Sequence, residues 1–338
     1  MVESWEHEEV VTRLGRRSGV PMTVAVHSRR LGPAAGGIRL RQYPTWQDGL
    51  ADALRLARGM TYKNAVAGLP FGGGKTVIAL PSPVTPTVRA DALADAAELI
   101  ESFGGTYLGG PDVGTTSEDM LYLRSFTSRV FCLPESAGGT GSSSGPTARG
   151  VLAAMRAGLS SVFGSPSVAG RRVVVVGMGS VGSLVARWLS ADGASVVVAD
   201  VDPARCAGYP QVPVSSAYSV AADVVVPAAI GGVVGADVRA PLVVGPANNQ
   251  LVSDDVAEAL AAAGVVWVPD FVASGGGVIY TLSREASGLS HEAAMDRVAA
   301  IEETAAAVLA AATANGTTPL AEAMALAEER LAALAPTP

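Results

Sequence analysis

Residues 171–182 read Arg-Arg-Val-Val-Val-Val-Gly-Met-Gly-Ser-Val-Gly, a run of valines that passes directly into a glycine-rich turn. Four valines without polar alternation indicate a parallel strand that is buried on both faces. Gly177, Gly179 and Gly182 have G-x-G-x-x-G spacing, and residues 183–190 are expected to form a helix. The glycine pattern is weak by itself. A buried strand before it and a helix after it predict a βαβ unit that binds a dinucleotide.

The three glycines have separate predicted roles in holding that dinucleotide. Gly177 would allow the tight turn, Gly179 would let a pyrophosphate approach backbone N–H groups, and Gly182 would allow a close contact between helix and strand. The intervening Ser180 and Val181 belong to the same predicted cofactor loop. A coincidental glycine turn is the competing interpretation, and the strand and helix around it make it the weaker one.

Asp200 ends the next expected strand, residues 194–200, and lies 18 residues after Gly182. A carboxylate at this place can accept hydrogen bonds from both hydroxyls of an adenosine ribose. It would repel a 2′-phosphate, so the sequence favours NAD over NADP as the cofactor. Asp202 or Arg205 could still modify this preference.

Three later apolar segments, residues 223–227, 242–245 and 265–269, read as further strands of a doubly wound sheet. The loops after them would lie at the carboxyl edge of the sheet, where ligands of this fold bind. Asn248 and Asn249 in one such loop are either ordinary turn formers or amides that hold ribose or nicotinamide. Thr147 and Ala228 complete the predicted cofactor contacts.

Residues 60–75, Met-Thr-Tyr-Lys-Asn-Ala-Val-Ala-Gly-Leu-Pro-Phe-Gly-Gly-Gly-Lys, place two lysines around an apolar run. An ammonium held against apolar surface loses hydration, so its pKa falls, especially beside a second ammonium. Lys63 and Lys75 are therefore candidates for a permanent binding charge and for a base that acts near neutral pH. The competing interpretation is that both side chains reach solvent from a strand edge.

The first 145 residues read as a mixed α/β segment. Thr45 is the expected N-cap of a helix over residues 45–60. Asp112 follows a short strand and precedes a helix that begins near residue 116 or 117, so it is either a capping residue or a functional carboxylate. The other expected elements are helices over 1–20 and 89–103 and strands over 21–28, 34–40, 65–69 and 76–80, the last two around a turn at 72–74.

Composition narrows the class of protein. The chain has 338 residues, 49% of them hydrophobic and 16% charged, so it should bury two ordered cores. A net charge of −7 argues against nucleic-acid or anionic-lipid partners. Cys132 and Cys206 are isolated and histidines are few, so neither a metal site nor a disulfide is expected. No signal peptide and no apolar run of about 18 residues is visible, which predicts a cytoplasmic protein without a membrane span.

Residues 135–147 are rich in glycine and serine and mark the expected domain boundary. We therefore expect an α/β fold with two domains. Residues 1–145 would form an N-terminal α/β substrate domain and residues 146–317 a doubly wound Rossmann NAD-binding domain, with a catalytic cleft between them. The alanine-rich C-terminal region reads as helices broken near 316–319, and the helix over 318–338 is expected to pack back on the first domain.

Six motifs in this order resemble the glutamate/leucine/phenylalanine/valine dehydrogenase family, most closely its leucine and phenylalanine branch. They are residues 31–37 (Leu-Gly-Pro-Ala-Ala-Gly-Gly), 60–75, 110–116 (Gly-Pro-Asp-Val-Gly-Thr-Thr), 177–182, 247–251 (Ala-Asn-Asn-Gln-Leu) and 269–279 (Pro-Asp-Phe-Val-Ala-Ser-Gly-Gly-Gly-Val-Ile). The resemblance implies NAD-dependent oxidative deamination of an L-α-amino acid to a 2-oxo acid and ammonia, or the reverse reductive amination. It also implies a homo-oligomer.

The resemblance further implies that Lys63 binds the substrate carboxylate and that Lys75 is the general base that activates water. Asp112 would carry protons to and from the amino nitrogen. Four positions match the family's substrate side-chain pocket without offering a charge, so an apolar amino acid is expected; they are Gly36, Gly37, Met60 and Gly110. Gly110, which has no side chain, would leave room for a branched or aromatic group.

Ser274 stands where the family usually has an asparagine that contacts substrate and cofactor. Serine is shorter and lacks the amide, so one orienting hydrogen bond would be lost or replaced by water. This departure is consistent with a specialised biosynthetic role. It also leaves two other hypotheses open: a catalytically silent regulator that binds NAD or an amino acid, and an NAD-linked enzyme that acts on a different carbon–nitrogen bond.

Overall fold

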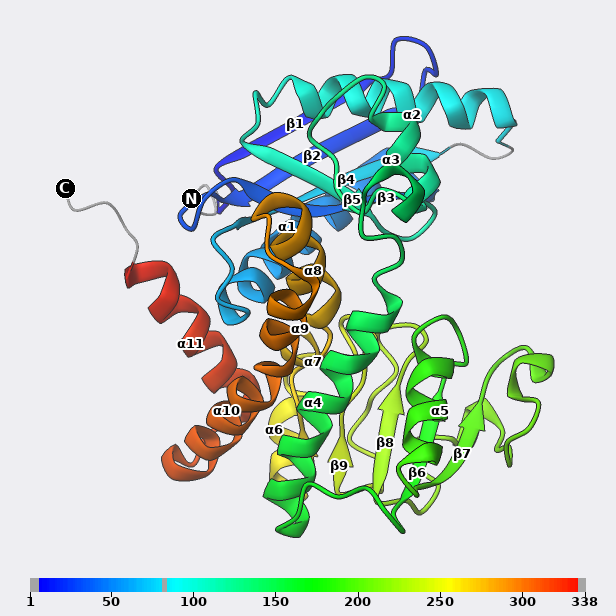
Figure 1. The fold of residues 1–338 in the computed structure, drawn as a ribbon, viewed down its shortest axis with the longest axis vertical. Coiled ribbons are helices and arrows are strands. Elements are labelled where there is room, and N and C mark those ends of the chain that lie inside the picture. The colour runs from blue at the N-terminus through cyan, green and yellow to red at the C-terminus, as the bar shows by residue number, and fades with distance from the viewer. Residues whose placement is uncertain (1–5, 81–83, 334–338) are drawn as a thin grey trace. The chain divides into compact units, whose positions relative to one another are not determined.

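The computed structural model describes residues 6–80 and 84–333, and the chain divides into two compact α/β units (Figure 1). The first unit consists of the residues up to Ser142, together with Thr281–Leu289 and the residues from Ala327 onward. The second unit consists of Ser143–Tyr280 and Ser290–Leu326. Each unit is therefore assembled from separate stretches of chain.

The first unit is built on a five-stranded mixed sheet with the spatial order β1-β2-β4-β3-β5. Its strands are β1 (Glu9–Leu14), β2 (Pro21–Ser28), β3 (Ala34–Gln42), β4 (Gly72–Leu80) and β5 (Tyr107–Pro111). β2 runs antiparallel to both β1 and β4, whereas β3 runs parallel to β4 and β5. The parallel half of the sheet therefore has the carboxyl ends of β3, β4 and β5 at one edge.

Helices cover both faces of this sheet (Figure 1). On one face lies α1 (Trp46–Val66), whose Ala53 and Ala57 pack with Val77 of β4. On the other face lie α2 (Pro86–Glu101) and α3 (Ser117–Leu123), over the larger apolar core that includes Ile78 and Ile100. Side chains alternate between the two faces along each strand, so neighbouring residues of β4 belong to different cores.

Capping explains where two of these helices begin. The Thr45 hydroxyl accepts a hydrogen bond from the Asp48 N–H, and the Asp48 carboxylate accepts one from the Thr45 N–H. This capping box confirms the predicted start of α1. Thr116 and Asp119 form the same arrangement at the start of α3, as expected for the helix after Asp112.

Two predictions about the first unit are wrong. Residues 9–14, expected to be part of a helix, form β1, because the β-branched run Val10-Val11-Thr12 pairs with β2 at the sheet edge. Residues 65–69 do not form a strand: α1 continues through Val66, and the chain turns at Gly68, which has φ of 63°. Residues 1–5 of the expected first helix lie outside the described residues.

The predicted glycine turn at residues 72–74 is also wrong, because these glycines begin β4. A Cβ atom at Gly73 would overlap the backbone nitrogen and the hydroxyl of Thr61 on α1. Glycine is therefore required here by the close approach of helix to sheet. This contact also fixes the last turns of α1 directly over β4.

The second unit contains a fully parallel sheet in the order β10-β9-β8-β6-β7. Its strands are β6 (Arg172–Val176), β7 (Ser195–Ala199), β8 (Val224–Pro227), β9 (Leu242–Val243) and β10 (Val266–Trp267). The strands predicted from the valine-rich segments are confirmed, and with them the α/β class and the Rossmann-type sheet. Between β6 and β8 the order of connection reverses, and sheets of this type commonly bind ligands at such a point.

The helices of the second unit begin with α4 (Ser144–Phe163), whose Gly158 lies against Leu242 of β9, and α5 (Gly182–Ala191), which connects β6 to β7. The remaining helices are α6 (Val256–Ala262), α7 (Asp270–Ala273), α8 (Gly276–Thr281), α9 (His291–Ala299), α10 (Ile301–Asn315) and α11 (Pro319–Ala333), of which α11 belongs to the first unit from Ala327 onward. The predicted break near residue 316 is confirmed: Gly316, with φ of 66°, ends α10.

Candidate functional site

One row of residues crosses the α1-covered face of the first sheet. Lys75 on β4 pairs with Ala25 of β2, and Gly37 on β3 pairs with Gly110 of β5. A Cβ atom at Gly37 would lie 2.8 Å from Lys75 Nζ and 2.7 Å from Asp112 Cβ. The missing side chain of Gly37 thus provides the space in which the ammonium and the carboxylate meet.

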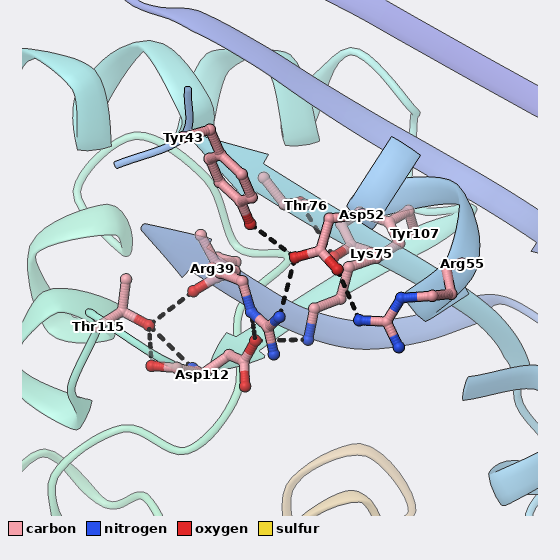
Figure 2. Close-up of polar contacts among 10 residues, drawn as sticks. Arg39, Tyr43, Asp52, Arg55, Lys75, Thr76, Tyr107, Asp112 and Thr115 are labelled. Atoms are coloured by element: carbon pink, nitrogen blue, oxygen red, sulfur yellow. Dashed lines mark hydrogen bonds and ion pairs between the residues drawn. The ribbon is translucent and has the colours of Figure 1, made fainter. Parts of the chain in front are cut away.

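Lys75 and Asp112 form a buried ion pair (Figure 2). Lys75 Nζ lies 2.7 Å from Asp112 Oδ2, and the two side chains are only 6% and 18% exposed. The backbone of the Asp112 loop is also fixed, because its N–H donates to the Thr115 hydroxyl at 2.9 Å, and that hydroxyl donates to the Ile38 carbonyl at 2.7 Å. Asp112 is therefore fixed through contacts of both its side chain and its backbone.

Burial controls the charge of this pair. Loss of hydration lowers the pKa of Lys75, and the positive charge of Arg39 acts in the same direction, against the opposing effect of Asp112. Burial by itself would raise the pKa of Asp112, but the charges of Lys75 and Arg39 outweigh it and hold that pKa well below its ordinary range. Asp112 therefore stays ionised, while Lys75 is the group that can lose a proton.

The second predicted lysine lies on α1. Lys63 is half-buried in the last turn of that helix, three residues after Met60. The neighbouring Asn64 is fully buried and donates from Nδ2 to the Gly72 carbonyl at 2.6 Å, which ties this turn to the start of β4. Of the 24 basic Lys and Arg residues in the sequence, Lys63 and Lys75 are the two lysines. Lysine therefore occurs only in the motif that carries the candidate site.

The space beside Gly110 is filled. A Cβ atom at Gly110 would overlap the Phe131 ring, with Cζ at 2.5 Å, so the ring lies directly over this glycine. The Phe131 ring thus takes up part of the room that was expected beside Gly110 and limits the size of a group that could lie there. Gly36 has another explanation: a Cβ atom there would overlap the Gly74 carbonyl oxygen, so glycine allows β3 and β4 to approach.

In the second unit, two of the three glycines of the turn after β6 have packing reasons. Gly177 has φ of 107°, and a Cβ atom there would lie 2.7 Å from the Ala228 carbonyl carbon. A Cβ atom at Gly182 would overlap the Gly177 carbonyl oxygen. Around Gly179, by contrast, no atom lies within 4 Å of the Cβ position. The protein offers no packing reason for glycine at 179, whereas a phosphate close to the backbone would.

Asp200 is held beside this turn. Its Oδ2 accepts a hydrogen bond from the Met178 N–H at 2.7 Å, and its Oδ1 accepts one from the Asp202 N–H at 2.9 Å. These backbone donors, with that of Asp202 first, lower the pKa of Asp200. The structure thus brings a fixed, ionised carboxylate to the glycine turn, with Ser180 exposed and Val181 half-buried in the same turn.

The remaining predicted residues of the second unit differ in their surroundings. The Thr147 hydroxyl donates to the Ser143 carbonyl within α4 at 2.8 Å. Asn249 has φ of 52° and accepts a hydrogen bond from the Gly232 N–H at its backbone oxygen, so it serves as a turn former; Asn248 is exposed beside it. Ser274 is 7% exposed, and its buried hydroxyl has no hydrogen-bond partner within residues 6–80 and 84–333.

Four residues of the first unit were missed by sequence reasoning: Arg39, Tyr43, Asp52 and Phe131. Arg39 donates from Nε to Asp112 Oδ2 at 2.8 Å and from Nη1 to Asp52 Oδ2 at 2.9 Å. One signal was present in the sequence. Arg39 lies two residues after Gly37 in a strand, so the two residues share a face of the sheet.

No group of three or more His, Cys, Asp or Glu side chains in residues 6–80 and 84–333 is arranged to hold a metal ion. Among the helices of these segments, none combines the length and the apolar character that crossing a bilayer requires.

Comparison with known proteins gives consistent matches. Residues 9–129 match the family model described as Glu/Leu/Phe/Val dehydrogenase, dimerisation domain. The chain is 35% identical to leucine dehydrogenase of Bacillus cereus, over 98% of this chain and 93% of that protein. It is 37% identical to valine dehydrogenase of Streptomyces virginiae, over 96% and 94%. The crystal structure of L-tryptophan dehydrogenase from Nostoc punctiforme superposes with a TM-score of 0.81 at 31% identity, covering 97% of each chain.

Proposed function

The chain belongs to the Glu/Leu/Phe/Val dehydrogenase family, and on that premise we propose that it catalyses oxidative deamination of an apolar L-α-amino acid, or the reverse reductive amination, with NAD. The observation that carries this proposal is the buried Lys75–Asp112 ion pair. A buried charge pair costs desolvation energy and is often no more stable than apolar residues of similar size. Its presence beside a glycine that makes room for it is better explained by chemistry.

Each charged group has one task in this proposal. Lys63 binds the substrate carboxylate as a permanent charge. Lys75, in its neutral form, accepts a proton from the water that attacks the imine carbon. Asp112 carries protons to and from the substrate nitrogen: it is ionised before the reaction, so it can accept a proton from that nitrogen and later return it. The proton-transfer roles are thus divided between two groups in different surroundings. Burial favours the neutral form of Lys75, whereas neighbouring positive charges favour the ionised form of Asp112.

NAD is the cofactor that the second unit fits. The open space at Gly179 would admit the pyrophosphate, with the backbone of Ser180, Val181 and Gly182 nearby, and the Asp200 carboxylate would accept the ribose hydroxyls. When bound, NAD supplies the acceptor for the hydride that leaves the substrate Cα. Thr147, Ala228 and the amides of Asn248 and Asn249 are further proposed contacts, and the buried Ser274 hydroxyl would gain a partner from ligand or water.

The substrate side chain is proposed to be a small branched aliphatic group. The Phe131 ring covers Gly110 in the row that contains Gly37 and Lys75, so it takes up space that a larger substrate would need. Leucine and valine dehydrogenases are among the similar proteins. Any use of an unusual amino acid in a specialised biosynthetic pathway would have to satisfy the same limit on size.

The two units would divide the work. We assign substrate binding and assembly to residues 1–145 and to the C-terminal helix, and NAD binding to residues 146–317. A homo-oligomer is proposed because the matching family model is described as a dimerisation domain and β1 is an edge strand of the first sheet. Light scattering coupled to size-exclusion chromatography would measure the assembly.

The test is NADH formation at alkaline pH with a panel of L-amino acids, compared between wild type and Lys75→Ala. We expect turnover of leucine or valine by the wild type and a loss of at least about 10²-fold in kcat for the variant. NAD binding, measured by fluorescence, should be equal in both. NAD binding by the wild type without turnover of any amino acid or 2-oxo acid would contradict the proposed dehydrogenase activity and favour a catalytically silent regulator.

A further inference from the structure

Arg39 lies between two carboxylates beneath α1 (Figure 2). Its Nε donates to Asp112 and its Nη1 to Asp52, and its side chain is 11% exposed. Asp52, on α1, is only 13% exposed and also accepts from the Tyr43 hydroxyl at 2.6 Å and from Arg55 Nη2 at 2.7 Å. The guanidinium therefore connects the carboxylate paired with Lys75 to a second carboxylate that several donors hold in place.

The two basic side chains contact the same oxygen of the Asp112 carboxylate. Lys75 and Arg39 both bind Oδ2, which leaves Oδ1 outside these two contacts. A carboxylate fixed by two donors on one oxygen cannot rotate without breaking both bonds. Its other oxygen is then held in one direction, which is what a group that exchanges protons with a substrate nitrogen requires.

A guanidinium is suited to this place because its donors point along fixed, divergent directions in one plane. Nε can meet Asp112 while Nη1 meets Asp52, and the group keeps its charge because the two carboxylates outweigh its burial and raise its pKa. A lysine at this position would supply the charge but a single nitrogen. It could not hold both carboxylates in the same geometry.

We propose that Arg39 is a positioning residue of the reaction: it locks Asp112 Oδ2 against Lys75 and thereby aims Oδ1 at the substrate nitrogen, while Asp52 and Tyr43 hold the guanidinium in that orientation. This inference rests on the proposed amino-acid dehydrogenase function. Arg39 itself touches neither reacting atom, so its effect passes through Asp112 and Lys75.

The closing experiment compares Arg39→Lys and Tyr43→Phe with Arg89→Lys in the purified full-length protein. Arg89 is a matched control: it forms a bidentate pair with Asp119 at 2.7 and 2.8 Å in the same unit, on the other face of the sheet. We expect Arg39→Lys to lower kcat by at least about tenfold with an unchanged KM for NAD, and Tyr43→Phe to lower it less. Arg89→Lys should keep wild-type kcat even if its melting temperature falls as far as that of Arg39→Lys.

A second readout does not depend on turnover. The chain has two lysines, so protein labelled with ¹³C-lysine gives one set of signals for each, and the titration of Lys75 can be followed directly. The charged groups that act on the pKa of its ammonium are Asp112, Arg39 and Asp52, and Asp52 in turn accepts hydrogen bonds from Tyr43 and Arg55. Loss of positive charge in Arg39→Gln should raise the pKa of Lys75, and the rise of the deamination rate with pH should move to higher pH by the same amount.

The outcomes are separable. An active wild type together with an Arg39→Lys variant of unchanged kcat would overturn the positioning role and leave the proposed function intact, as would an unchanged Lys75 titration in Arg39→Gln. A wild type that turns over no amino acid would overturn the proposed function, and the positioning role with it. Loss of kcat in Arg39→Lys with a normal fold, beside an active Arg89→Lys, supports the inference.

Discussion

At Lys75, two opposing effects act on one ammonium group. Asp112 at 2.7 Å favours the charged form, whereas nearly complete burial and the charge of Arg39 disfavour it. Burial dominates, because removing an ion from water costs more than one partner returns. The same surroundings leave Asp112 ionised, so a single site contains a carboxylate that is ionised before the reaction and a lysine that can lose its proton.

This balance predicts the pH dependence of oxidative deamination. The neutral amine is the active form of Lys75, so the rate should rise as pH increases through its pKa. Because that pKa is lowered, the rise should occur below the pKa of an exposed lysine. The measurement is kcat/KM for leucine between about pH 6 and 11. A rise centred at or above the exposed value would contradict it, and Lys75→Arg should remove the rise together with the activity.

Phe131 leads to a prediction about substrate size. Phe131→Val removes the ring that lies over Gly110 and opens space in the row that contains Lys75. The ratio of kcat/KM for phenylalanine to that for leucine should increase by about tenfold or more. Phe103→Val, in the apolar core over the opposite face, is the control and should lower stability without changing this ratio. An unchanged ratio in Phe131→Val would remove Phe131 from the substrate site.

The candidate residues Lys63, Lys75 and Asp112 could be selected from the sequence because their types and spacings are distinctive: two lysines lie around an apolar run and an aspartate precedes a helix. Phe131 and Asp52 could not. Each becomes significant only when the fold brings it to Gly110 or to Arg39, and no local pattern records that contact. Gly110 shows the same limit: its lack of a side chain was visible, but the ring that fills the space was not.

At the scale of elements, the glycines of the turn between β6 and α5 differ in whether the surrounding protein leaves room for a side chain. Gly182 is needed because a side chain would overlap the Gly177 carbonyl, whereas Gly179 faces open space. The valine strands around this turn were predictable because buried parallel strands have continuous apolar sequences. β1 was not, since its pattern also fits a helix and its pairing with β2 decided the outcome.

The two glycines should therefore respond differently to the same substitution. Gly179→Val should leave the melting temperature within about 2 °C of wild type but weaken NAD binding by at least about 10²-fold, because the side chain occupies the proposed phosphate position. Gly182→Val should lower the melting temperature strongly or prevent folding. Thermal unfolding and NAD titration of both variants check this. Normal NAD binding by Gly179→Val would show that the cofactor lies elsewhere.

At the scale of the whole chain, the C-terminal helix α11 supplies hydrogen bonds to the end of α1. Arg330 Nη1, near the end of α11, donates to the carbonyls of Ala65 and Val66, which are among the last carbonyls of α1. In the same region Tyr62 donates to Glu328 at 2.6 Å. Helix-terminal carbonyls have no partner within their own helix, so α11 supplies what α1 lacks.

Removing this contact should affect the site through Lys63. Arg330→Ala leaves the two carbonyls to water, and we expect a loss of about 1–3 kcal/mol in the free energy of unfolding. The KM for the amino acid should rise, because the last turn of α1 carries the lysine proposed to bind its carboxylate, while the KM for NAD should not change. Arg297→Ala, an exposed residue of α9, is the control. Equal KM values in Arg330→Ala and wild type would argue against this coupling.

The distance along the chain between these partners has a consequence for biosynthesis. Arg330 follows Ala65 by 265 residues. A ribosome that adds 5–20 residues per second would need roughly 10 to 50 s to make that interval. During this time a nascent chain has α1 and most of its first sheet but not the cap of the helix. The last turn of α1, which carries Lys63, would thus reach its final form only after all of the second unit has been translated.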